Sequence, residues 1–259
     1  MQTKIINSSK KVSKVILGDR DFRILCFLFE NKVATRNQIN RYFFGGISKD
    51  TVNRRLRKIL SLGLICRMSL NAGREVTYCY SLTQRGLTKI RPLLPYSVKG
   101  KATLSECLIH DTALVDIRKV FEKQISVQHY FTENVLQSCV DYQDNEELHP
   151  FVELNSDAVA FVDSKVGVLK LAIEFDTTHK SKVRYGKKVD EYYCRNGVDG
   201  VLYICMEKYN LRGLQKVDQQ VATRHGSKPK MYFSLFSNVI NAENELIFKN
   251  ANGSVFRVK

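Results

Sequence analysis

The segment SKDTVNRRLRKILSLG, residues 48–63, has one apolar face and one basic face. Val52, Leu56 and Ile59 recur at three and four residues, the spacing of a helix that buries one side. Ser48 is suited to cap the first turn, and Gly63 is suited to end the helix. The opposite face carries Lys49, Asn53, Arg54, Arg57 and Lys58. We expect an amphipathic helix whose basic face is free to contact a partner.

Two helices are expected before this segment and a β-hairpin after it. Residues 19–31, DRDFRILCFLFEN, and residues 34–44, ATRNQINRYFF, place apolar side chains at helical spacing. Residues 64–70, LICRMSL, and residues 75–82, EVTYCYSL, alternate in the manner of strands, with Arg74 at the tip between them. Helix, helix, basic helix and hairpin is the order of a winged helix-turn-helix. We place that domain at residues 19–95.

The positive charge of the chain is confined to its first part. Residues 1–100 hold 20 Lys and Arg against 5 Asp and Glu, whereas residues 101–259 hold 21 of each. Such a density favours a polyanion, and its confinement to one segment argues against a merely solubilising surface. We predict that the domain binds double-stranded DNA, with the basic helix in the major groove and Arg74 at the backbone or minor groove. Residues 1–18 are expected to form a basic, flexible tail.

A second domain is predicted at residues 102–259, after a hinge at about 92–102. A helix is expected over residues 103–124, followed by strand-like segments at 125–136, 147–154, 156–163 and 168–176. Residues 179–259 then alternate helix, strand, helix and strand before a terminal hairpin. This succession predicts a mixed sheet in an α/β sandwich. The whole chain is therefore expected to have an α/β (α+β) fold.

Three carboxylates are expected to converge in this sheet. Asp157 begins one strand, while Glu174 and Asp176 share a face at the end of the next. A charge inside the apolar stretch LAIEFD is costly without a partner or a metal. The set suits Mg²⁺ or Mn²⁺, which could polarise a phosphate and activate water. In the plainer interpretation Asp157 is a cap and the other two pair with lysines of the next helix.

Neighbouring residues extend this candidate site. Lys180 lies just beyond the second strand, where it could hold a phosphate or take a proton. Glu106 and His110 are four residues apart and are expected to share a face of the helix at 103–124. His110 could equally be a satisfied core histidine. The Lys- and Tyr-rich helix at 179–197 is more typical of packing and phosphate contact than of a covalent tyrosine mechanism.

Asp157 together with Glu174-Phe175-Asp176 on adjacent strands resembles the core of the PD-(D/E)XK nucleases. The longer succession runs from the helix-hairpin region through His110, SDAVAFVD and LKLAIEFDTTHK to the Lys/Tyr helix. It is similar to the plasmid replication-relaxation family, which includes the MobC-type mobilisation relaxases. The similarity extends from about Asp19 to Tyr193.

This resemblance implies a restriction-endonuclease-like domain in which Asp157 and Glu174 are the metal carboxylates. Asp176 would occupy the position usually held by lysine, and Glu106 or His110 would complete the site. The implied activity is metal-dependent, site-specific nicking of duplex DNA at a transfer or replication origin. Ser156 stands where the nuclease motif usually has proline, and Lys180 or Lys182 could substitute for the replaced lysine.

Two other functions stay open on this sequence. One is a non-catalytic winged-helix transcriptional regulator or replication accessory protein with a vestigial nuclease domain. The other is a nuclease subunit that needs a partner protein before it cleaves. A mobilisation or replication accessory protein and a second copy of the chain, forming a homodimer, are the protein partners we expect. No Walker A loop or dinucleotide-binding glycine pattern supports the use of ATP or NAD.

The composition also predicts a compartment. No segment approaches the roughly 20 apolar residues that a bilayer span needs, so we expect no membrane association. Seven cysteines are scattered singly, without a C-x-x-C pair or zinc-ligand spacing. Small buried thiols of this kind are typical of a reducing cytosol, so a cytoplasmic location is expected.

Overall fold

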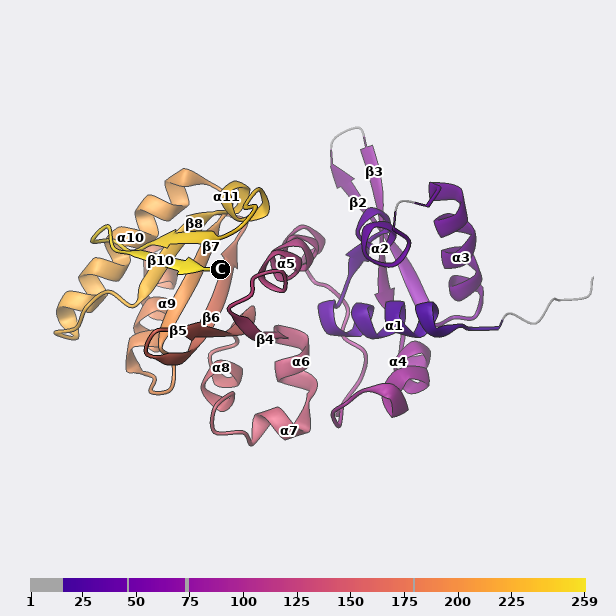
Figure 1. The fold of residues 1–259 in the computed structure, drawn as a ribbon, viewed down its shortest axis with the longest axis horizontal. Helices are drawn as coiled ribbons and strands as arrows, with labels where there is room; N and C mark the ends of the chain where they lie inside the picture. Colours follow the sequence, from indigo (N-terminus) through magenta and orange to yellow (C-terminus); the bar gives the residue numbers. More distant parts are fainter. Residues whose placement is uncertain (1–15, 46, 73–74, 179) are drawn as a thin grey trace, which may run out of the picture.

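The computed structural model describes residues 16–45, 47–72, 75–178 and 180–259. Figure 1 shows an elongated molecule, with the first elements of the chain at one end, the last elements at the other, and α5 between them. The fold is a mixed α/β one, as the sequence predicted. No helix among these described residues is both long and apolar enough to cross a membrane.

The first part of the chain has three helices followed by a hairpin, in the order that the sequence indicated. Strand β1, which the sequence did not indicate, pairs with β3 and gives a small antiparallel sheet of order β1-β3-β2. The elements are α1 (Asp19–Asn31), β1 (Ala34–Thr35), α2 (Arg36–Phe43), α3 (Lys49–Ser61), β2 (Ile65–Ala72), β3 (Glu75–Leu82), α4 (Gln84–Ile90) and a 3-10 turn at Arg91–Leu93. Their assignment as a winged helix-turn-helix stays a prediction. Arg74 and residues 1–15 of the predicted tail lie outside the described residues.

Local side-chain signals set the helix starts in this part. Thr35 accepts a hydrogen bond from the Gln38 backbone at the start of α2, and Ser48 accepts one from the Thr51 backbone at the start of α3. The apolar stripe of α3 then packs into a core with α1, and Gly63, with φ of 67°, turns the chain into β2. The stripe is thus buried and the basic face left outside.

The second part is built on a seven-stranded mixed sheet of order β10-β9-β8-β7-β6-β5-β4. The pairs β6–β7 and β7–β8 are parallel, and the other pairs are antiparallel. The strands are β4 (Val127–Thr132), β5 (Ala158–Ser164), β6 (Gly167–Asp176), β7 (Gly200–Cys205), β8 (Met231–Leu235), β9 (Leu246–Lys249) and β10 (Val255–Val258). Strands β5, β6 and β7 are the most buried part, so the end of β6 lies in the interior of the sheet.

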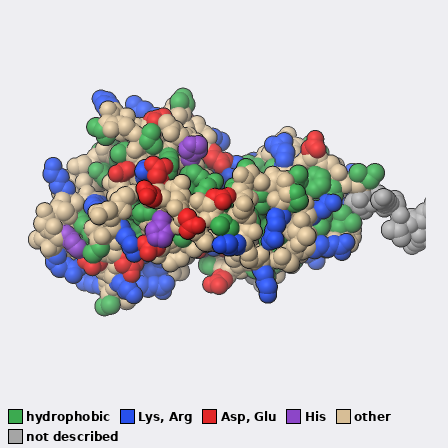
Figure 2. Space-filling view, turned by 90° about the horizontal axis from the view of Figure 1, so that it is seen from below, with side chains coloured by type: hydrophobic (Ala, Val, Ile, Leu, Met, Phe, Trp, Pro, Cys, Tyr) green, Lys and Arg blue, Asp and Glu red, His purple; other side chains and the backbone are tan. Residues whose placement is uncertain are grey.

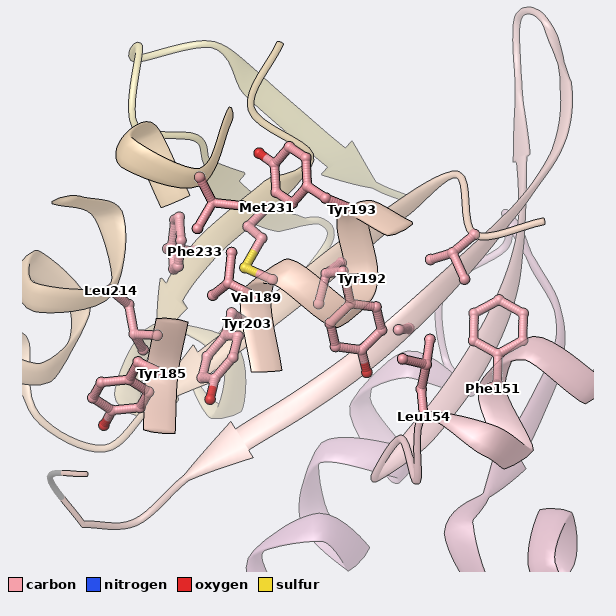
Figure 3. Packing of buried hydrophobic residues seen from close by; sticks show 14 of the residues in the cluster. Phe151, Leu154, Tyr185, Val189, Tyr192, Tyr193, Tyr203, Leu214, Met231 and Phe233 are labelled. Carbon is pink, nitrogen blue, oxygen red and sulfur yellow. The ribbon is translucent and has the colours of Figure 1, made fainter. Parts of the chain in front are cut away.

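Helices cover both faces of this sheet and bury two apolar clusters. The cluster on one face is formed with α9 and α10 and includes Tyr192 and Tyr203; the cluster on the other face is formed with α5 and α11. The helices are α5 (Leu108–Phe121), α6 (Glu133–Ser138), α7 (Val140–Gln143), α8 (His149–Glu153), α9 (Lys182–Cys194), α10 (Lys208–Arg224) and α11 (Phe236–Ile240). Figure 3 shows the first cluster. The predicted α/β sandwich is therefore present.

Three sequence-based expectations about these elements were wrong. The strand expected at 125–136 ends as β4 at Thr132, and residues 133–136 belong to helix α6, which Thr132 caps. The segment 147–154 forms the short helix α8 and not a strand, because Pro150 lacks the N–H that a ladder needs and is favoured in a first helical turn. The helix expected from residue 103 begins at Leu108 instead, with Asp111 in the first turn, where the helix dipole favours an acidic group. Glu106 therefore lies outside the helix and does not share a helical face with His110.

The two parts of the chain are joined by buried contacts as well as by the connecting segment. Asn134 Nδ2 donates to the Phe29 carbonyl at 2.6 Å, and Gln38 Nε2 donates to the Thr112 carbonyl at 2.7 Å. Val115 of α5 and Val135 of α6 also belong to the apolar core of the first part. Helix α5 is thus packed against both parts. The segment 92–102, where the domain boundary was predicted, starts within the 3-10 turn and ends before this helix begins at Leu108.

Candidate active site

Asp157 and Glu174 are brought together by the pairing of β5 with β6. Ala158 pairs with Ile173, so Asp157, one residue earlier, lies beside Glu174. Both carboxylates line one cleft of about 180 Å³. The Asp157 Oδ2 atom accepts a hydrogen bond at 2.8 Å from the Phe175 backbone, which fixes this carboxylate against the end of β6. Two of the three predicted carboxylates therefore share a cleft.

Glu174 is a buried carboxylate with two donors from α9. Its side chain is only 7% exposed, and Lys188 Nζ lies 3.2 Å from its Oε1 atom. The Tyr192 hydroxyl donates to the same oxygen. Burial raises the pKa of Glu174 to about 7; the Lys188 charge and the Tyr192 hydrogen bond lower it, and the Asp157 charge raises it. The site thus holds Glu174 close to the balance between its charged and neutral forms.

His110 reaches the same point from α5. Its Nε2 atom lies 3.4 Å from Asp157 Oδ2 and 3.1 Å from the Phe175 carbonyl oxygen, and its Nδ1 atom lies 3.0 Å from Asp111 Oδ1. Burial lowers the pKa of His110, but hydrogen bonds and charges from Asp111 and Asp157 outweigh it and raise the pKa to about 10. At neutral pH the imidazole is therefore protonated between two carboxylates.

Asp176 shares a face of β6 with Glu174, but it is held away from the cleft. It is 1% exposed, forms an ion pair with Lys180, and accepts a hydrogen bond from the Tyr203 hydroxyl at 2.9 Å. Asp176 is absent from the side chains that line the cleft, whereas Lys180 is among them. Glu106 is exposed in the bend before α5 and Lys182 is exposed at the start of α9, and neither lines the cleft.

Several side chains at this site were not identified from the sequence. Lys188, Tyr192, Arg184, Asn155 and Asp111 all lie in the cleft or directly behind it. A signal for Lys188 does exist, because it lies between Tyr185 and Tyr192 at helical spacing and so on the side of α9 that faces the sheet. Figure 3 shows the hydroxyls of Tyr185, Tyr192 and Tyr203 directed to the same side, toward β6.

Residues 25–197 match the sequence model of the replication-relaxation family. The chain belongs to the replication-relaxation family. The matched residues include α3, His110, Asp157 and Glu174, as well as Lys188. The family resemblance inferred from the sequence is thereby confirmed.

The chain was also compared with solved structures and with curated proteins. A solved structure of the restriction endonuclease FokI bound to DNA is similar to this chain with a TM-score of 0.25 and 10% sequence identity. The similarity covers 85% of this chain and 43% of that one, so the chain spans less than half of that endonuclease. A likeness of this size does not define a shared fold. Among curated proteins, the comparison found no match to this chain.

Asp157 and Glu174 line the same cleft as Phe175, whose carbonyl oxygen lies 3.1 Å from His110 Nε2. Carboxylate and carbonyl oxygens are the types of ligand that Mg²⁺ and Mn²⁺ take. Two neighbouring carboxylates repel each other, and a cation would relieve that repulsion. Figure 2 shows one face of the molecule, on which acidic side chains lie mainly in the middle and many basic ones lie along the rim.

The basic face of α3 is open to solvent. Lys49, Arg54, Arg57 and Lys58 are exposed and Asn53 is half-buried, while Val52, Leu56 and Ile59 are fully buried. Arg55 differs from its neighbours because it forms an ion pair with Asp21, which is 2% exposed. Arg55 is therefore held by an ion pair within the protein, whereas the lysines and arginines predicted to contact DNA on the same helix are exposed.

Proposed function

We propose that this replication-relaxation protein binds double-stranded DNA through α3 and the β2–β3 hairpin and nicks it with Mg²⁺ or Mn²⁺ at Asp157 and Glu174. The observation that carries the proposal is the buried Glu174 carboxylate, which lies beside Asp157 in an open cleft with Lys188 3.2 Å away. We place the activity at a transfer or replication origin of a plasmid or other mobile element, in keeping with the family.

DNA binding is supported by the position of the charge. The exposed cations of α3 lie on the face opposite its buried apolar stripe, so they can enter a DNA groove without disturbing the core. Arg67 of β2 stacks over the Tyr78 ring of β3 at 4.6 Å, which adds an exposed cation to the hairpin. These groups are suited to phosphate and base contacts.

The cleft residues would divide the chemistry among them. Asp157 and Glu174 would hold the ion, and a bound Mg²⁺ or Mn²⁺ supplies polarisation of the phosphate and an activated water. Lys188 is placed to neutralise negative charge that develops on the phosphate. His110, protonated at neutral pH, can donate a hydrogen bond or a proton to a phosphate oxygen.

A specific observation also favours a second function, a DNA-binding regulator without cleavage. Lys188 already pairs with Glu174, and protonated His110 already lies against Asp157, so both carboxylates have cationic partners of their own. A vestigial nuclease domain would retain such ion pairs for stability alone. The nuclease should produce nicked DNA only when a divalent metal is present, whereas the regulator should bind DNA without cleaving it.

The test is plasmid relaxation. Wild type, Glu174→Gln and the control Asp163→Asn are incubated with supercoiled plasmid carrying the DNA that flanks the gene, with Mg²⁺, Mn²⁺ or EDTA. Asp163 is exposed on β5, so its change should leave the cleft intact. We expect nicking by wild type and Asp163→Asn, none by Glu174→Gln, and none in EDTA. DNA binding without nicking by any of the three would support the regulator.

A further inference from the structure

A group of side chains that could ligate a metal lies in the last turns of α9, beyond the cleft residues Arg184 and Lys188. Asp190 and Cys194 are four residues apart on α9 and so share a face of that helix. His225, the C-terminal cap of α10, meets them from the neighbouring helix. One ligand atom from each of the three lies within 4.8 Å of the others.

The donor set indicates which ion would bind. A thiolate, an imidazole and a carboxylate are the ligands of tetrahedral Zn²⁺, whereas Mg²⁺ takes oxygen ligands. We propose that Asp190, Cys194 and His225 form a Zn²⁺ site that joins the end of α9 to the end of α10. This site is separate from the carboxylates of the cleft and does not depend on the proposed nuclease activity.

The imidazole is already directed at the site. The His225 ring stacks on Tyr193 with 5.5 Å between centroids, and its Nε2 atom lies 2.8 Å from Asp190 Oδ1. Tyr193 is itself fixed, because its hydroxyl donates to Asp218 at 2.6 Å and accepts from the Lys230 backbone at 2.9 Å. A Zn²⁺ ion would replace the proton between the imidazole and the carboxylate. With metal–ligand bonds of about 2.0–2.2 Å, His225 Nε2 and Asp190 Oδ1 would then lie about 0.5–1 Å further apart than they do now.

The surroundings allow an ion to enter. Cys194 is exposed and the His225 side chain is 31% exposed, so water can reach the site and supply the fourth ligand. Arg224 Nη2 lies 3.9 Å from Asp190 Oδ1, but this side chain is 64% exposed and can turn into solvent when a cation binds. Three protein ligands with one open position are typical of zinc sites that exchange a ligand.

The test uses Co²⁺ as a spectroscopic probe of the full chain. The reduced protein is freed of metal with a chelator and titrated with Co²⁺, and a thiolate-to-cobalt charge-transfer band is recorded in the near ultraviolet. Variants are Cys194→Ser, His225→Ala and the control Cys107→Ser, which removes another exposed thiol. Asp157→Asn is included because Co²⁺ can also bind carboxylates in the cleft, where no thiolate band can arise.

We expect the band to saturate at one ion per chain and to disappear when Zn²⁺ is added. It should be lost in Cys194→Ser, persist in Cys107→Ser and Asp157→Asn, and require at least about tenfold more Co²⁺ in His225→Ala. Zn²⁺ should raise the Tm of wild type but not that of Cys194→Ser. A wild type without the band, or a band that survives Cys194→Ser, would overturn the proposal.

Discussion

Lys188 Nζ lies 3.2 Å from Glu174 Oε1 and donates to the Leu154 carbonyl at 2.7 Å, so one ammonium joins α9, β6 and the end of α8. Replacing it with methionine removes this positive charge beside Glu174 while keeping most of the apolar stem. For Lys188→Met we expect nicking of plasmid to slow by about 10²-fold or more, because charge developing on the phosphate loses its cation. DNA affinity should not change.

The matched control for this variant is Lys187→Met, on the exposed side of α9. Both variants lose one positive charge, so a purely electrostatic effect on DNA approach would affect them equally. Circular dichroism melts are needed beside the rates, because an unpaired buried carboxylate destabilises the fold. Equal rates for Lys188→Met and wild type would contradict the role given to this lysine.

Two adjacent arginines of α3 should respond in opposite ways to truncation. Arg55 pairs with the buried Asp21, so Arg55→Ala leaves a buried carboxylate without its partner and should cost about 2 kcal/mol of unfolding free energy. Arg54 is exposed, so Arg54→Ala should change stability by no more than about 0.5 kcal/mol. Urea unfolding measures both.

DNA binding should show the reverse order for the same pair. Arg54→Ala removes a predicted DNA contact and should weaken binding by about 1 kcal/mol or more, with a smaller salt dependence. Arg55→Ala, at a temperature where it remains folded, should bind almost as wild type does. Fluorescence anisotropy at several salt concentrations checks this, and equal losses for the two would reject the assignment of α3 as the DNA-contacting helix.

Two glycines in helices offer a further contrast. A Cβ atom on Gly86 of α4 would lie 2.1 Å from the Leu64 carbonyl oxygen, a backbone atom that cannot easily shift. Gly86→Ala should therefore destabilise the protein by about 1–3 kcal/mol or more. Gly213 of α10 has open space at the same position, so Gly213→Ala should stabilise by about 0.5–1 kcal/mol. Thermal unfolding that ranks the two in the opposite order would contradict this packing.

The sequence predicted those elements whose signals are local. Helix α1 was expected at residues 19–31 and is found there, and Ser48 caps α3 as expected. Strand β1 was missed because two residues hold no periodicity and it exists only by pairing with β3. The segment of α8 was assigned to a strand because apolar residues in a short run fit both periods.

From the sequence, strand alternation and strand order could predict only which carboxylates of the candidate site lie near one another. Alternation placed Glu174 and Asp176 on one face, and adjacency of strands placed Asp157 near them. What surrounds each carboxylate depends on tertiary contacts, and these separate Asp176, held by Tyr203 and Lys180, from Glu174 in the open cleft. Helical spacing places Lys188 on the same side of α9 as Tyr185 and Tyr192, but only the packing of α9 on the sheet shows that Lys188 meets Glu174.

Asp218 of α10 should make stability depend on pH. It is fully buried, its Oδ1 atom accepts from Tyr193, and its Oδ2 atom has no hydrogen-bond partner among the described residues. Burial raises its pKa from 3.8 to about 6, although the Tyr193 hydrogen bond lowers it. The folded state therefore binds this proton more tightly than the unfolded state, so the stabilisation is complete below about pH 4 and is lost as the pH rises through 6.

Asp218→Asn keeps the acceptor for Tyr193 and removes the titration. We expect the variant to match wild type near pH 4 and to exceed it by up to about 3 kcal/mol at pH 8, because a carboxylate no longer has to be charged in the interior. Urea unfolding from pH 4 to pH 8 measures the difference, with the exposed Asp144→Asn as control. Parallel curves for wild type and Asp218→Asn would show that this carboxyl keeps its ordinary affinity for protons in the folded state.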